Sequence, residues 1–219
     1  MEPDPRWLAR VTSIKMIALW RYLKKLSEEL KHIKNKKIKS NCTSVNMYFQ
    51  DESRFGLMTI LRRMITAKGV KPIATYQHKF KNLYLFGAFS GINGAHFLLE
   101  MPYCNSDTFQ VFLDMFAQSN PDEFKILILD NGAFHHAKTL VLPDNIALLF
   151  LPPYSPELNP AENMWQHIKA KVSLAVHKTL ADLQNKLSET IQKDVDETIV
   201  KSICGREFYV NNFQCVFNV

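Results

Sequence analysis

A nearly continuous apolar run, FKILILDN at residues 124–131, ends on the carboxylate of Asp130. This run predicts a strand that is buried on both faces, because strands covered by helices on both sides lose the usual alternation of apolar and polar residues. NIALLFLP at 145–152 predicts a second strand of this kind. Helices are predicted around the two strands at 106–119, 135–141, 161–176 and 180–199.

Three further strands are predicted ahead of this region. VNMYFQD closes on Asp51, and the runs at 82–90 and 95–101 are joined by GING, which is typical of a hairpin. A meander of three antiparallel strands is therefore expected, followed by a helix from 106 that starts with a Ser or Asp cap. The whole order of elements predicts an α/β fold, with a sheet of mixed direction and helices on its faces.

The N-terminal part of the chain differs in composition. Apolar residues recur at helical spacing over 6–30, and a lysine-rich linker is predicted over 31–44. The net charge of +6 is matched by Arg21–Ser40 alone, which holds eight basic and two acidic residues. Five lysines in this segment suit contact with the phosphate backbone of DNA, although a solvated linker without DNA contacts would have the same composition. They are Lys31, Lys34, Lys36, Lys37 and Lys39.

Several classes of protein are not indicated. No apolar run approaches the length of roughly 20 residues that a membrane span needs, and the N-terminus lacks the order of a signal peptide. The cysteines and histidines show no zinc-ligand spacing, and no glycine-rich phosphate loop is present. A cytoplasmic protein associated with the nucleoid, without a membrane partner, is expected.

Three carboxylates stand at positions that could meet. Asp51 and Asp130 end predicted strands, and Glu162 lies in the first turn of a predicted helix. If the first strand lies parallel to the fourth, the side chains converge at one edge and would bind hard divalent ions. Taken singly, an Asp at a strand end is often a turn former, and an early helical Glu often complements the dipole. Glu52 is the rival of Asp51, because neighbouring strand residues point to opposite faces.

Five motifs resemble, in the same order, the catalytic domain of IS630-type transposases, which belong to the Tc1/mariner group of DDE transposases. They are DESRFGL (51–57), AKGVKP (67–72), LYLFGAFSGING (83–94), LILDNGAFHHAK (127–138) and LPPYSPELNPAENMW (151–165). The resemblance implies a ribonuclease H-like fold, with a mixed five-stranded sheet, helices on both faces and an additional N-terminal helix. It also implies that Asp51, Asp130 and Glu162 are catalytic residues that bind two ions of Mg²⁺ or Mn²⁺.

Other residues receive roles from the same resemblance. Asn131 and His135 are expected to support the metal ligands or contact DNA, or else only to satisfy loop carbonyls. The prolines of 151–160 are expected to stop the fifth strand and aim the helix that carries Glu162. Glu157 is expected to be a surface acid. Asn159 and Asn163 are expected to cap and brace this helix, and Trp165 to pack it on the sheet.

The expected domains are 1–44, an N-terminal helix and basic linker left from a DNA-binding region; 45–178, the catalytic domain; and 179–219, a helical tail. Family members usually carry a helix-turn-helix region before the catalytic domain. Because only about forty residues precede it here, a split frame with a separately encoded helix-turn-helix half, or a truncated copy, is expected. Double-stranded DNA, as transposon terminal repeats and target, is the expected partner of a homodimer.

The sequence therefore predicts a DNA transposase subunit that hydrolyses phosphodiesters and transfers strands. Two alternatives remain open. One is a catalytically silent DNA-binding remnant of a decayed element. The other is a ribonuclease H-like nuclease without strand transfer, because one fold hosts many functions.

Overall fold

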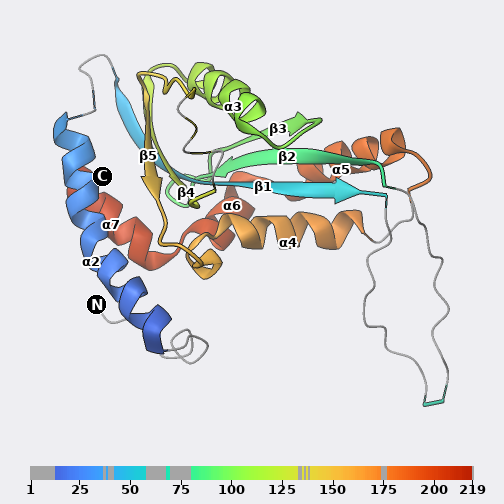
Figure 1. Cartoon of the computed structure of the whole chain (residues 1–219), viewed down its shortest axis with the longest axis horizontal. Coiled ribbons are helices and arrows are strands. Elements are labelled where there is room, and N and C mark those ends of the chain that lie inside the picture. Colours follow the sequence, from blue (N-terminus) through green and yellow to red (C-terminus); the bar gives the residue numbers. More distant parts are fainter. Residues whose placement is uncertain are drawn as a thin grey trace.

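The computed structural model describes residues 13–36, 38, 42–57, 68–69, 80–132, 135, 137, 139–173 and 177–218. Five strands form one mixed sheet in the order β3-β2-β1-β4-β5 (Figure 1). The strands are β1 (Ser44–Gly56), β2 (Asn82–Phe89), β3 (His96–Met101), β4 (Glu123–Leu129) and β5 (Ile146–Phe150). The predicted α/β fold with a sheet of mixed direction is confirmed.

The first three strands form the predicted antiparallel meander, since β1 pairs with β2 and β2 pairs with β3 in that sense. Gly94 closes the hairpin between β2 and β3 with a φ of 84°, a conformation that side chains with a Cβ rarely adopt. β4 runs parallel to β1 and to β5. Strand β1 is therefore central, with an antiparallel neighbour on one side and a parallel neighbour on the other.

Helices cover both faces of the sheet. On one face, Met47, Phe49 and Ile126 belong to the larger core cluster. This cluster includes buried side chains of α2 (Ser13–Lys36), α4 (Ala161–Val172), α5 (Leu180–Asp194), α6 (Glu197–Cys204) and α7 (Glu207–Phe217). On the other face, Tyr48 and Leu127 pack on α3 (Ser106–Ser119), whose phenylalanines face the sheet. Successive residues of β1 thus enter two separate cores.

The helices differ from those predicted in a cap, in bounds and in number. Helix α3 is capped by Asn105 and not by Ser106 or Asp107, because the Asn105 side chain accepts from the Thr108 amide at 2.9 Å. The described residues of 135–141 contain no α-helix. Helix α4 ends at Val172. The predicted helix over 180–199 is two helices, since Asp196 starts α6 as its N-cap.

The N-terminal helix extends further than expected and belongs to the main core. α2 continues through Lys36, so the first part of the predicted linker over 31–44 is helical. Leu26, Leu30 and Ile33 are buried in the cluster that also holds residues of α7. The predicted start of this helix, residues 6–12, lies outside the described residues. The described part of α2 thus packs as an outer layer of the catalytic fold.

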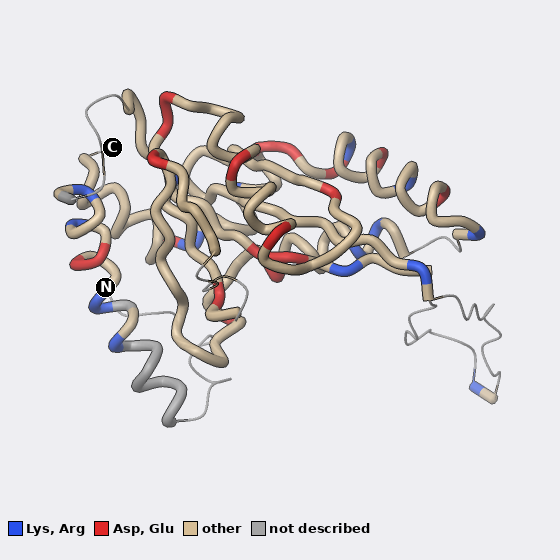
Figure 2. Tube along the Cα trace, turned by 45° about the horizontal axis from the view of Figure 1, so that its top comes forward, with Lys and Arg blue, Asp and Glu red and all other residues tan. Residues whose placement is uncertain are grey.

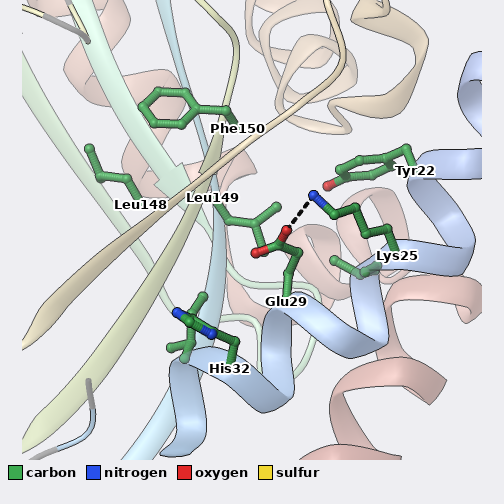
Figure 3. A pocket seen from close by; sticks show the side chains of 9 residues that line it. Tyr22, Lys25, Glu29, His32, Leu148, Leu149 and Phe150 are labelled. Atoms are coloured by element: carbon green, nitrogen blue, oxygen red, sulfur yellow. Dashed lines mark ion pairs between the residues drawn. The ribbon is translucent and has the colours of Figure 1, made fainter. Parts of the chain in front are cut away.

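A pocket of about 360 Å³ lies between α2 and the edge strand β5. Figure 3 shows its lining, with Lys25 and Glu29 forming an ion pair of 2.8 Å beside Leu149. Both charged side chains are more than a third exposed, so this pair contributes little to stability. None of the helices in the described ranges is long and apolar enough to cross a membrane.

The five lysines proposed for DNA contact have different surroundings. Basic residues recur along the described part of α2 (Figure 2), and Lys31 is exposed there. Lys34 instead donates to the Val216 carbonyl at 2.6 Å, at the end of α7. Lys37 and Lys39 lie outside the described residues, as does the side chain of Lys36. Lys34 therefore stabilises the packing of α2 on α7 in this conformation.

Candidate active site

The sequence predicted that Asp51 ends a strand, but Asp51 lies inside strand β1. β1 continues to Gly56, but its parallel pairing with β4 stops at Phe49. Beyond that point the strand described beside β1 is β2, in which Gly87 lies opposite Asp51. The end of β4 thus leaves one side of β1 without a neighbouring strand at the level of Asp51, and this opens the space in which its carboxylate can meet others.

Asp130 follows the last residue of β4 and is held by its own loop. Its Oδ1 accepts from the Gly132 amide at 2.8 Å and lies 3.2 Å from His135 Nε2. The His135 ring is buried against Phe109 of α3, with ring centroids 4.5 Å apart. Asp130 itself is largely exposed, so a buried imidazole orients an acid that remains open to solvent.

The proline-rich turn delivers Glu162 to the same region. Asn159 holds this turn in place. Its Nδ2 donates to the carbonyl of Gln50 at 2.9 Å, and its Oδ1 accepts from the Ala161 amide at 3.1 Å. The formal N-cap of α4 is Pro160, which makes no side-chain cap. Asn159 thereby ties the start of α4 to the residue next to Asp51, and Glu162 stands exposed in the first turn of the helix.

Glu157, in this turn, differs from expectation, whereas Asn131, in the loop after β4, satisfies a loop carbonyl, which is one of its two expected roles. Glu157 is half-buried, not a surface acid, and its Oε1 has no hydrogen-bond partner among the described residues. Its carbonyl accepts from the guanidinium of Arg206. Asn131 donates its side-chain amide to the carbonyl of Leu151, so in this conformation it holds the loop after β4 to the start of the turn.

Glu162 and Asp130 both contribute to the electrostatic surroundings of Asp51. The pKa of the Asp51 carboxyl is raised to about 7; burial is the largest cause, and the negative charges of Glu162 and Asp130 are further causes. Only charges at short range through a poorly screened interior have such effects. Asp51, from the middle of a strand, is therefore close to acids from a loop and from a helix that lie far apart in the sequence.

Glu52 points to the opposite face of the sheet from Asp51, as its place in a strand predicts. Its Oε1 accepts from Gln50 Nε2 at 2.7 Å and lies 3.9 Å from His135 Nε2. The pKa of this carboxyl is raised to about 8. Burial is the largest cause, and the negative charges of Asp51 and Asp130 are further causes. Glu52 thus contacts the imidazole that orients Asp130, while Asp51 faces α4.

Trp165 has a role that the sequence did not reveal. It packs α4 on the sheet as expected, edge-on to Phe55 and Phe89. Its indole Nε1 also donates to Asp51 Oδ2 at 2.9 Å, which stabilises the charged carboxylate. The sequence does contain one signal of this role. Trp165 follows Glu162 by three residues, and residues at i and i+3 share a helix face.

The donor set fits a hard divalent cation, which prefers carboxylate oxygens. The raised pKa of Asp51 gives a physical reason for a cation, because three nearby carboxylates repel one another without one. Within the described part of the chain, however, no three His, Cys, Asp or Glu side chains already stand close enough to hold an ion. The three acids therefore lie in one region without forming a complete set of metal ligands.

Gly87 leaves the space that Trp165 occupies. A Cβ at this position would lie 2.6 Å from the indole ring and 2.7 Å from Phe89. We expect Gly87→Ala to destabilise the protein by about 1–3 kcal/mol and to disturb the contact between Trp165 and Asp51. Thermal unfolding with tryptophan fluorescence measures both effects. Gly56→Ala is the matched control in the neighbouring strand, since its Cβ would meet only ordinary contacts of 3.5 Å.

A central strand bearing one acid, a parallel neighbour followed by a second, and a helix bearing a third are arranged as in a ribonuclease H-like fold. A family model described as DDE superfamily endonuclease matches residues 46–184. The chain belongs to this family, and the resemblance seen in its sequence motifs is confirmed at that level.

One curated protein and several solved structures are similar to this chain. The "Uncharacterized protein y4pE/y4sA" of Sinorhizobium fredii (strain NBRC 101917 / NGR234) is 39% identical over 123 residues, or 56% of this chain and 80% of that protein. Among solved structures, a pre-cleavage Mos1 transpososome matches 99% of this chain and 67% of its own, with a TM-score of 0.63 and 15% identity. A Mos1 mariner paired-end complex with Mn matches 100% and 64%, with a TM-score of 0.56 and 17% identity. The chain thus spans about two thirds of those transposase chains, and the likeness establishes the fold.

Proposed function

We propose that this chain is the catalytic part of a DNA transposase, which hydrolyses a phosphodiester at a transposon end and joins the freed 3′ hydroxyl to target DNA. The observation that carries the proposal is the electrostatic convergence of Asp130 and Glu162 on Asp51, in a chain of the DDE endonuclease family. Double-stranded DNA is accordingly the proposed substrate.

Asp51, Asp130 and Glu162 would hold Mg²⁺ or Mn²⁺, with two ions as the proposed number. Bound ions would neutralise charge on the phosphodiester and promote ionisation of the attacking hydroxyl. The chain's own residues position the ligands. Trp165 orients Asp51 by its indole N–H, and His135 orients Asp130 from within the core.

The surroundings of the acids suit an attack on a bulky polymer. Asp130 and Glu162 are exposed, so an extended DNA backbone can reach them, while Asp51 lies deeper beside β2 and α4. An exposed site of this kind excludes little water, which fits a reaction whose first nucleophile is water. We further propose that the protein acts as a homodimer.

The proposal is tested by incubating the full chain with supercoiled plasmid and with duplexes that carry a pre-cut 3′ hydroxyl end, in Mg²⁺, in Mn²⁺ or in a chelator. Nicking and end joining that require the ion are expected. Nicking without joined product would instead favour a nuclease, and binding without either product would favour a silent remnant. Equal affinity for terminal-repeat and random DNA, falling steeply with salt, would show that only backbone binding remains.

Glu52 and Asp51 are expected to differ in their contributions to this activity. Glu52→Gln replaces the carboxyl that lies 3.9 Å from His135 Nε2 but leaves the face toward α4 unchanged. Such supporting contacts typically contribute about 10- to 100-fold, so partial activity is expected to survive. Nicking rates of the two single variants, Glu52→Gln and Asp51→Asn, measure the difference. An equal and complete loss in both would assign Glu52 a direct role.

A further inference from the structure

Tyr154 is the most exposed large apolar side chain in the described part of the molecule, with 89% of its surface accessible. It lies in the proline-rich turn after β5, and this turn leads into α4. The course of the chain from β5 to α4 is seen in Figure 1. Tyrosine is enriched at interfaces, because its ring is apolar and its hydroxyl is polar. The backbone and the anchors of the turn show that Tyr154 is held in place.

The backbone at Tyr154 is held in an unfavourable conformation. Its φ is 56°, and the other described non-glycine residue with a positive φ is Asn218, the C-cap of α7, where such a value is common. For a bulky residue such as tyrosine the left-handed region costs free energy. The ring recovers none of that cost by burial. Strain retained at an exposed residue points to a function that needs it there.

The turn that carries Tyr154 is fixed at both ends. The Leu151 amide donates to the Leu129 carbonyl at 2.8 Å, so the turn starts beside the end of β4. The Leu158 carbonyl accepts from Tyr209 of α7 at 3.1 Å. Prolines on both sides of Tyr154 further restrict the chain. The ring therefore projects from a rigid support.

The anchors also tie the turn that carries Tyr154 to the segments that bear the acids. Asn131, next to Asp130, donates to the carbonyl of Leu151, three residues before Tyr154. Eight residues after Tyr154 the chain reaches Glu162, and Asn159 ties the intervening turn to the residue before Asp51. Tyr154 is therefore carried by the segment that joins the loop of Asp130 to the helix of Glu162.

We propose that the Tyr154 ring stacks on a nucleotide base of the DNA next to the phosphodiester that is cut. The inference rests on the proposed function, because that function brings DNA to the acids. A neutral planar ring offers a stacking surface to any base, whereas phosphates are bound by basic groups. Tyr154 thus positions the substrate strand without taking part in bond cleavage.

The test uses the full chain and a mixed-sequence duplex with a single-stranded 3′ overhang, in which thymines are replaced one at a time by 5-iodouracil. Light crosslinks this base to an aromatic ring stacked on it. Crosslinks that map to the peptide containing Tyr154 are expected, both in the natural protein and in Asp130→Asn. Crosslinking in a chain that never nicks DNA would reject the catalytic proposal and leave the stacking contact standing.

Affinity for the same duplex gives a second measurement. Tyr154→Ala is expected to weaken binding by about 5- to 100-fold, the loss that one base–aromatic stack gives, whereas Tyr154→Phe keeps the ring and the affinity. Phe80→Ala is the matched control, an exposed aromatic preceding β2 with 75% of its surface accessible. Unchanged affinity in Tyr154→Ala, or crosslinks only elsewhere, would overturn the proposal. So would a loss of self-association without any change in DNA affinity, since the ring would then contact protein.

Tyr154→Gly separates strain from binding. Glycine adopts a positive φ without cost, so this variant is expected to unfold at a higher temperature than Tyr154→Ala while binding DNA equally weakly. A variant that is more stable and yet binds less is the signature of strain retained for function. Equal unfolding temperatures would show that the turn is unstrained and would contradict the argument.

Discussion

The Asp130→Asn variant is expected to lose divalent-ion-dependent nicking of DNA by at least roughly 100- to 1,000-fold. Asparagine keeps the shape of the side chain, and its oxygen can still accept from the Gly132 amide, which lies 2.8 Å from Oδ1. Only the negative charge is removed. The loss would therefore report on the charge that the proposed ions need, and rates on supercoiled plasmid in Mg²⁺ and in Mn²⁺ measure it.

Asp122→Asn is the matched control, because Asp122 is an exposed aspartate just before β4 while Asp130 is the exposed residue just after it. The control is expected to nick DNA at the normal rate. Nicking that persists undiminished in Asp130→Asn would contradict the catalytic role of this acid. Normal thermal unfolding of both variants would exclude misfolding as the cause.

The Asp51→Asn variant is expected to be more stable than the natural protein at pH 8 in the absence of divalent ions. Burial and neighbouring acids raise the pKa of Asp51 to about 7, from an ordinary value of about 4. Between these values the folded protein binds more protons than the unfolded chain, so stability falls as the pH rises from about 4 to about 7. An amide has no charge to lose, and the gain at pH 8 is roughly 1–4 kcal/mol.

The gain should shrink toward zero near pH 4, where Asp51 is protonated in the folded protein. Unfolding by urea at pH 4.5 and at pH 8, with a chelator present, measures it, and Asp122→Asn serves again as the control. Mn²⁺ is expected to stabilise the natural protein at pH 8 and to stabilise Asp51→Asn much less. A stability difference that is equal at both pH values would refute the electrostatic account.

Most of the sheet could be predicted from the sequence because its strands carry strong local patterns. The buried run of β4 and the GING hairpin determine the element type by composition, and α3 was predicted with its observed bounds. The errors have two kinds of cause. The helix break at Asp196 follows from a local signal that was missed, since the Asp196 side chain caps α6. The extension of α2 follows from a tertiary contact, because Ile33 is buried in the core.

The site was only partly predictable. The three acids were predicted from strand ends and sequence motifs, yet Asp51 proved to be mid-strand, since the sequence did not show that β1 continues to pair with β2 as far as Gly56. Trp165 was assigned to the core without its bond to Asp51. His135 Nε2 and Glu52 Oε1 lie 3.9 Å apart, although the two residues are 83 positions apart in the sequence and no local pattern links them.

By itself the sequence determined the kinds of element, the family and the acids offered to a cation, because apolar periodicity, turn residues and motif wording are local properties. Only the tertiary structure decided which acids share a region, which tryptophan and histidine orient them, and that Tyr154 stands exposed on a strained turn. These features depend on how β1, β4 and α4 meet, and a meeting of distant segments is determined by packing across the whole chain.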